Sequence, residues 1–165
     1  MSQRIQHIIE DITEQYLEND GNIPWIIGFS GGKDSTGVLT LVWRALLAIR
    51  ATHGDESLKR PVFVVNNDTL VENPIISDYI IEVLDCIKTA AVKQDLPITV
   101  QITTPKLEDS FWISFLGKGY PVPNNQFRWC TDRLKIKPTS QFILDKIDAI
   151  GEARVLIGTR LSESA

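Results

Sequence analysis

The sequence has only two cysteines, Cys86 and Cys130, and neither belongs to a CxxC pair. Two distant cysteines exclude a disulfide framework and are too few for a metal cluster held by this chain alone. The sequence also lacks any apolar run near the roughly 20 residues of a membrane span. Its acidic N-terminus lacks the basic and apolar segments of a secretory signal. We therefore expect a cytoplasmic protein without a membrane segment.

The chain has no excess of positive charge, because its formal net charge is −4. This charge excludes a general electrostatic binder of nucleic acid. The charge is unevenly distributed, however. The first 20 residues are acidic, whereas the segment FRWCTDRLKIK carries four cations against Asp132 alone: Arg128, Arg133, Lys135 and Lys137. This segment is predicted to form a basic patch that faces an anionic partner.

Internal repeats and low-complexity segments are absent, and 165 residues fit one domain, 1–165. Apolar residues at helical spacing predict helices at about 5–17, 38–50, 74–91 and 138–150. Short apolar runs predict buried strands at 25–29, 61–67, 96–103 and 153–158. Strands that alternate with helices predict an α/β fold: a doubly wound, mainly parallel sheet with helices on both faces.

Several details of these elements are also predicted. Gly21 is the expected C-terminal cap of the first helix, and Cys86 is expected to be a packed core thiol on the apolar face of the third helix. Ile76 and Tyr79 belong to that face. Between the third strand and Pro138 we expect a short helix, EDSFWISFL, and then a loop as far as Cys130. Pro138 is expected to open the last helix.

The polar and unusual residues follow the predicted strands. SGGKDS comes after the first strand, NNDTLVEN after the second, TPKLED after the third and GTRLSES after the fourth. In doubly wound sheets ligands bind beyond the carboxyl ends of the strands, where the strand order reverses. We therefore expect these four segments to share one edge of the sheet and to form a single site.

The stretch GFSGGKDS is predicted to bind phosphate. Two glycines between a strand and a helix also suit a simple tight turn. The flanking residues favour an anion site instead, because two hydroxyls and an ammonium group surround a helix N-terminus, which carries unpaired amides and partial positive charge. The stretch is not a Walker P-loop, because Ile27 replaces the first glycine and Asp34 replaces the magnesium-binding hydroxyl residue. It also fails the dinucleotide pattern GxGxxG.

The pattern SGGxDS resembles the pyrophosphate loop of the PP-loop ATP pyrophosphatases, which include tRNA-thiolating enzymes and PAPS reductases. Those enzymes usually cleave ATP between the α- and β-phosphates and adenylate a substrate oxygen. The resemblance implies that Ser30, Gly31, Gly32, Lys33 and Ser35 bind pyrophosphate. It further implies that Asp34 orders the loop or reaches magnesium, with Lys33 and Asp34 among the catalytic residues.

Three further segments carry parts of the same resemblance. NNDTLVEN is either a capped turn or a segment that lies beside the nucleotide, in which Asp68 contacts Mg²⁺ or ribose. GTRLSES resembles the segment after the last core strand, in which Gly158 and Arg160 face the nucleotide and Arg160 binds phosphate oxygens as a catalytic residue. RWCTDRLKIKP resembles the C-x-x-R-K-x-x-P signature of PAPS reductases, although Trp129 replaces a cysteine and Leu134 interrupts the Arg-Lys pair. An iron-sulfur cluster at Cys130 would need cysteines from outside this chain.

Taken together, GFSGGKDSTGVLTLVW, NNDTLVENP, DSFWISFLGKGYPVPNNQFRWCTDRLKIKPTSQFI and LIGTRLSESA resemble the DndC family of DNA phosphorothioation proteins over nearly the whole chain. The resemblance implies an enzyme that activates a DNA backbone phosphate with ATP and Mg²⁺ for sulfur incorporation. It implies three kinds of partner: DNA, other Dnd proteins and a cysteine desulfurase as sulfur donor. Members of that family are longer, so the chain is expected to be an N-terminal fragment.

Two other functions remain open from the sequence. A PAPS reductase-like enzyme would bind a 3′-phosphorylated nucleotide and use a reducible nucleophilic cysteine. A non-catalytic subunit would bind ATP without cleaving it. In the DNA phosphorothioation function, the residues expected to face the DNA substrate or a cluster are Arg128, Arg133, Lys135 and Lys137.

Overall fold

The computed structural model describes residues 3–18, 23–124 and 126–159. Within these ranges four parallel strands form one sheet with the order β3-β2-β1-β4. The strands are β1 (Trp25–Gly28), β2 (Val62–Asn67), β3 (Ile98–Thr103) and β4 (Arg154–Leu156). This confirms the predicted α/β fold. Because β2 and β3 lie on one side of β1 and β4 lies on the other, the strand order reverses at the end of β1. The stretch GFSGGKDS, residues 28–35, lies at this point, and we call it the glycine loop.

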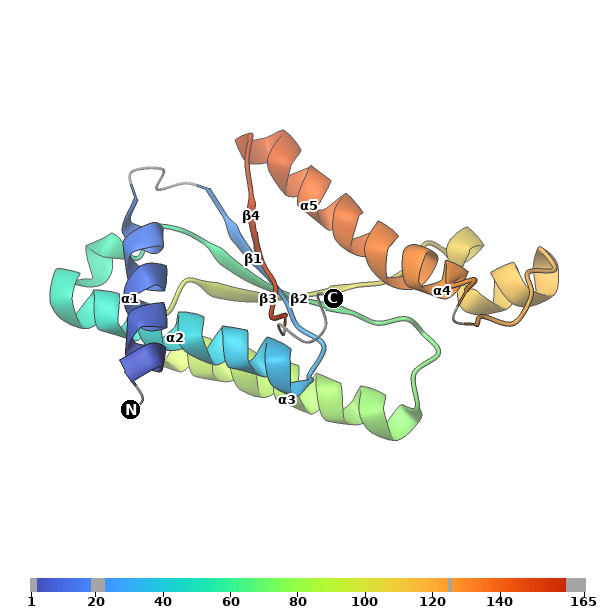
Figure 1. The fold of residues 1–165 in the computed structure, drawn as a ribbon, viewed down its shortest axis with the longest axis horizontal. Helices are drawn as coiled ribbons and strands as arrows, with labels where there is room; N and C mark the ends of the chain where they lie inside the picture. The colour runs from blue at the N-terminus through green and yellow to red at the C-terminus, as the bar shows by residue number, and fades with distance from the viewer. Residues whose placement is uncertain (1–2, 19–22, 125, 160–165) are drawn as a thin grey trace.

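Long helices cover both faces of this sheet (Figure 1). On one face lie α1 (Gln3–Leu17), α2 (Lys33–His53) and α3 (Pro74–Lys93), and on the other lies α5 (Lys137–Ile150). Phe142 of α5 packs edge to face on Phe63 of β2, with ring centroids 5.7 Å apart. The shorter turns are η1 (Asp55–Ser57), η2 (Leu107–Asp109), η3 (Ile113–Gly117), α4 (Trp129–Thr131) and η4 (Asp132–Ile136). None of the helices in the described ranges is long and apolar enough to cross a membrane.

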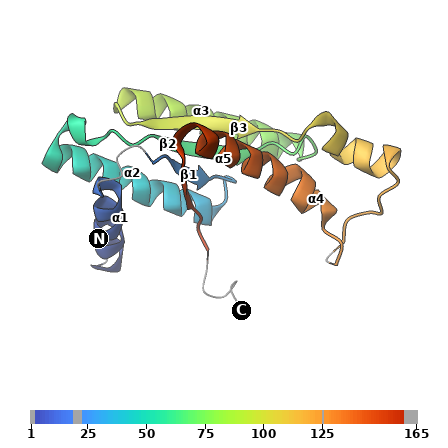
Figure 2. The same ribbon diagram turned by 90° about the horizontal axis from the view of Figure 1, so that it is seen from above.

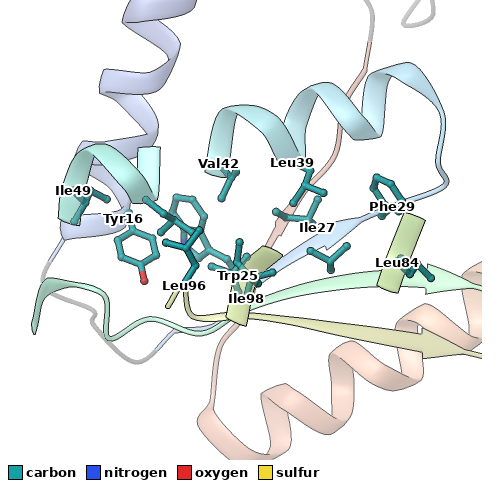
Figure 3. Close-up of a cluster of buried hydrophobic side chains, with 14 residues drawn as sticks. Tyr16, Trp25, Ile27, Phe29, Leu39, Val42, Ile49, Leu84, Leu96 and Ile98 are labelled. Carbon is teal, nitrogen blue, oxygen red and sulfur yellow. The ribbon is translucent and has the colours of Figure 1, made fainter. Parts of the chain in front are cut away.

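The hydrophobic core lies between the sheet and helices α1 to α3 (Figure 3). Trp25 and Ile27 of β1 point into this core, while Ile26 is buried on the opposite face. A strand buried on both faces needs a continuous apolar run, and WII at 25–27 provides one. Phe29 and Leu84 lie at the far end of the cluster from Tyr16, close to the carboxyl ends of the strands. The core therefore reaches the base of the predicted site.

Helix α1 is held by Tyr16, which is buried and donates a hydrogen bond of 2.7 Å to the carbonyl oxygen of Arg60. Burial raises the pKa of the Tyr16 phenol from 10.0 to about 12, although the bond to Arg60 and the charge of Arg60 oppose this rise. The folded state thus binds the phenolic proton more tightly than the unfolded state does.

We predict that this proton contributes stability below pH 10 that is lost as the pH rises towards about 12. The expected loss is on the order of 2 kcal/mol by pH 12 relative to the variant Tyr16→Phe, which has no phenol to ionise. Urea unfolding of both proteins between pH 8 and pH 12 measures it. Parallel pH profiles for the two proteins would contradict the prediction.

The structure corrects the predictions for the start of α3 and for the segment before Pro138. Ile76 and Tyr79 are half exposed rather than core residues, because the first turns of α3 lie at the carboxyl edge of the sheet, where Ile76 lines an open pocket. The helix before Pro138 begins at Trp129, where a loop was expected, and reaches α5 through the π turn η4. Pro138 lacks an amide proton, and the wider turn before it lets the helix continue.

From the end of β3 to the first residue of α5 the chain forms an excursion, residues 104–137, that we call the arm. Figure 1 and Figure 2 both show it extending beyond the carboxyl ends of the strands. The arm has its own aromatic cluster. Trp129 is buried, stacks on Phe111 with centroids 5.4 Å apart and donates a hydrogen bond to the carbonyl oxygen of Pro121. Tyr120 packs edge to face on Trp129.

Candidate functional site

The glycine loop joins β1 to α2, and hydrogen bonds of its two serine hydroxyls stabilise it. Gly31 has φ +73°, a conformation that glycine adopts readily, and Gly32 precedes the first helical residue, Lys33. The Oγ atoms of Ser30 and Ser35 are 3.3 Å apart, and Ser35 Oγ also donates to the carbonyl oxygen of Gly32. No side chain caps the 21-residue helix at Gly32. The loop therefore presents hydroxyls and an ammonium group at an uncapped helix start, which favours an anion.

The end of β4 lies against the first turn of α2. A Cβ atom on Gly158 would come within 2.8 Å of the backbone oxygen of Asp34 and 2.9 Å of Val38 Cγ2. Only glycine allows this approach without a shift of the chain. Two of the predicted site residues, Asp34 and Gly158, are thus adjacent at the point where the strand order reverses.

A pocket of about 450 Å³ opens beside the loop at the carboxyl ends of β1, β2 and β3. This volume is within the roughly 300–1,000 Å³ of small-molecule sites. One wall is apolar and comes mainly from α3, with Ile76, Ile80, Ile81 and Leu84. Polar residues from four segments line the rest: Ser30, Asn66, Asn67, Asp68, Glu72, Ser77, Lys135 and Thr139. We call it the central pocket.

Two asparagines at the end of β2 form hydrogen bonds that join the elements around the central pocket. Asn66 is buried and donates to the carbonyl oxygen of Phe29 over 2.8 Å, which fixes the start of the glycine loop. Asn67 Oδ1 accepts from Thr103 of β3 and from Thr139 of α5, the latter over 2.9 Å. The sequence motif NNDTLVEN contains both asparagines, but nothing in it indicates these partners. Thr139 had no sequence signal at all.

The turn after β2 combines a structural cap with a polar pocket wall. Asp68 Oδ1 accepts from the amide of Leu70 over 2.9 Å, and Leu70 has φ +61°. Thr69 is buried and donates to Glu72 Oε1 over 3.2 Å. The predicted capped turn is therefore present. Its carboxylates, Asp68 and Glu72, also line the central pocket.

The four predicted cations of residues 128–137 do not form a single patch, although Arg133 and Lys137 meet at Asp109. Lys135 lines the central pocket, with Nζ 3.9 Å from Glu72 Oε1. Arg133 contacts the Asp109 carboxylate and donates to the Tyr120 hydroxyl over 2.6 Å. Lys137 Nζ is 3.5 Å from Asp109 Oδ2, and Arg133, Asp109 and Lys137 line a second cleft, distinct from the central pocket. Arg128 is exposed on the arm.

The remaining predicted residues are placed as follows. Lys33 is exposed at the start of α2, and Cys130 is half buried in α4. Cys86 is exposed rather than packed, because it borders an open groove between α2 and α3. Among the described residues no three His, Cys, Asp or Glu side chains form a metal-binding group. Arg160 lies outside the described residues.

A scan against protein-family models and a search of the curated proteins both gave no match. The resemblance to the DndC family therefore stays a hypothesis. The structure itself shows the glycine loop, the turn after β2 and Lys135 around one pocket.

Proposed function

We propose that the chain binds ATP in the central pocket and uses it to adenylate a DNA backbone phosphate, with release of pyrophosphate, as a step of DNA phosphorothioation. The observation that carries this proposal is the position of Ser30. It belongs both to the loop that is proposed to bind phosphate and to the lining of a pocket with an apolar wall. A nucleotide needs this combination, because its base is largely apolar and its phosphates are charged.

In this proposal the base packs on the wall of Ile76, Ile80 and Ile81, and the β- and γ-phosphates lie at the loop. An oxygen of the DNA phosphate attacks the α-phosphorus, the bond between the α- and β-phosphates breaks, and pyrophosphate leaves. The loop residues 30–35 stabilise the charge of the leaving pyrophosphate, which makes electrostatic stabilisation the main catalytic contribution. The motif GTRLSES assigns Arg160 the role of binding phosphate oxygens of the nucleotide.

Mg²⁺ fits the donor set of the central pocket. It prefers oxygen ligands and is usually held by one or two carboxylates together with substrate phosphates. Asp68 and Glu72 supply two carboxylates beside the loop. When bound, the ion offsets the negative charge of the phosphates. An iron-sulfur cluster does not fit the described residues, because Cys86 and Cys130 lie on separate elements and no group of ligands surrounds either.

The acceptor phosphate is proposed to approach from the arm. Lys135 is the cation of the basic segment that lines the central pocket, so it is assigned to the incoming DNA phosphate. The outer sulfur of a persulfide formed with a cysteine desulfurase would then attack the activated phosphorus and displace AMP. A thiol would reduce the resulting S–S bond and release the phosphorothioate, in steps shared with other Dnd proteins.

The double variant Ser30→Ala/Lys33→Ala tests the ATP site. We expect its affinity for ATP to fall at least tenfold, because it loses one hydroxyl and one ammonium group at the phosphates. Isothermal titration measures this affinity. The matched control is Ser57→Ala/Lys59→Ala, which removes the same two groups beyond the other end of α2 and should bind ATP as the wild type does. Equal affinity in the loop variant and the wild type would refute the loop assignment.

A second measurement separates catalysis from binding. Wild-type protein incubated with ATP, Mg²⁺, DNA and the partner Dnd proteins should release pyrophosphate, and the loop variant should not. ATP binding without pyrophosphate release in this mixture would favour the non-catalytic function. Tighter binding of PAPS than of ATP would favour the sulfonucleotide reductase.

A further inference from the structure

The arm differs from the rest of the chain in charge and in exposed apolar surface. Residues 104–137 contain six Lys and Arg against three Asp and Glu, a net charge of +3 in a chain of net charge −4. Lys106 and Arg128 are exposed, and neither forms an ion pair with a described residue. Trp112 is 58% exposed and Phe127 is 45% exposed. A surface of cations and aromatic rings suits single-stranded nucleic acid.

The aromatic cluster of the arm holds these exposed groups in place. Phe111 packs edge to face against Trp112, with ring centroids 5.3 Å apart, and stacks on Trp129. Trp129 directly follows Phe127 and Arg128 in sequence, so Phe111 brings Trp112 close to that segment. Asn124 accepts from the amide of Phe127, which fixes the turn before it. The two exposed rings are therefore preorganised, which reduces the entropy lost on binding.

The arm is continuous with the central pocket. Lys135, at its end, lines that pocket, and Thr139 of the following helix is bonded to Asn67 of β2. A strand that lies along the arm would thus lead to the phosphate-binding edge of the sheet.

We propose that the arm binds an unpaired stretch of the DNA strand, with Trp112 and Phe127 stacked on bases and with Lys106 and Arg128 on backbone phosphates. This inference rests on the proposed function, since the strand supplies the phosphate that is activated in the central pocket. Base stacking requires unpaired bases, so the arm distinguishes a single strand from a closed duplex.

Fluorescence anisotropy with a labelled 20-nucleotide single strand and the matching duplex tests the arm. The variant Trp112→Ala/Phe127→Ala should bind the single strand roughly tenfold more weakly. The variant Lys106→Gln/Arg128→Gln should reduce the slope of log affinity against log salt by about 1.4, or about 0.7 per lost phosphate contact. The controls are Tyr79→Ala/Val92→Ala and Lys88→Gln/Lys93→Gln, which change exposed residues of α3 and should bind as the wild type does.

The test of strand binding by the arm can fail or succeed independently of the test of the ATP site. All arm variants should keep wild-type affinity for ATP, and the loop variant Ser30→Ala/Lys33→Ala should keep wild-type affinity for the single strand. Arm variants that bind the strand like the wild type, or a wild type that binds ATP but no strand, would overturn the inference. So would equal binding of strand and duplex. Arm-dependent binding to phosphatidylserine vesicles without strand binding would overturn it in favour of a membrane surface.

Discussion

Replacing Asp109 with alanine is expected to loosen the arm internally and to lower the free energy of unfolding by about 3 kcal/mol. The Asp109 side chain is only 17% exposed, and three cations surround it. It contacts Arg133, and its oxygens lie 3.5 Å from Lys137 Nζ and 3.9 Å from Lys118 Nζ. Without the carboxylate these cations lose their shared partner and repel one another. Arg133 also loses the partner that holds it against the ring of Tyr120.

Urea unfolding and limited proteolysis measure this effect, and cleavage should appear first within residues 104–137. The control Asp132→Ala removes a carboxylate that is 59% exposed and 4.0 Å from Lys137 Nζ. It should change stability by less than about 1 kcal/mol, because surface ion pairs contribute little. If Asp109→Ala and Asp132→Ala are equally stable and equally resistant to protease, Asp109 does not hold the segments of the arm together.

The variant Gly158→Ala should lose about 2–3 kcal/mol of stability and should bind ATP at least tenfold more weakly. Its new methyl group meets the backbone oxygen of Asp34 at 2.8 Å, and backbone moves less readily than a side chain. The chain relieves the overlap by shifting the end of β4 or the first turn of α2. Either shift displaces the amides that are proposed to bind phosphate.

Gly37→Ala is the matched control, because it adds the same methyl group within α2, where nothing lies within 4 Å of the new atom. Alanine is the better helix former, so this variant should gain about 1 kcal/mol of stability and keep its affinity for ATP. Unfolding curves and ATP titrations of the two variants give both comparisons. Equal stability and equal ATP affinity in Gly158→Ala and the wild type would show that the close approach has no consequence.

The sequence was sufficient for the fold because its signals are local. Apolar runs such as WII at 25–27 suit only strands covered on both faces, and the spacing of Val42, Leu46 and Ile49 matches one face of a helix. Alternation of the two elements then requires parallel strands, whose carboxyl ends share one edge. The position of the loop GFSGGKDS at that edge followed from the sequence alone.

Other features were not readable from the sequence because they depend on contacts between distant residues. The burial of Thr69, the bonds of Asn67 to Thr103 and Thr139, and the pairing of Arg133 with Asp109 join separate elements. A charge run such as FRWCTDRLKIK does not indicate which of its cations will meet an internal carboxylate. The exposure of Cys86 was missed because a helical pattern predicts which face is apolar but not how closely the next helix packs on it.

The sequence by itself thus determined the order of the strands and helices along the chain, the parallel sheet and the place of the loop after β1 at its carboxyl edge, because propensity and periodicity act over a few residues. The tertiary structure alone decided which side chains surround the central pocket. It brought Lys135 to the pocket and turned Arg133 away, and it placed Gly158 on the first turn of α2. These contacts arise from the packing of β4, α5 and the arm against the sheet, which no single segment specifies.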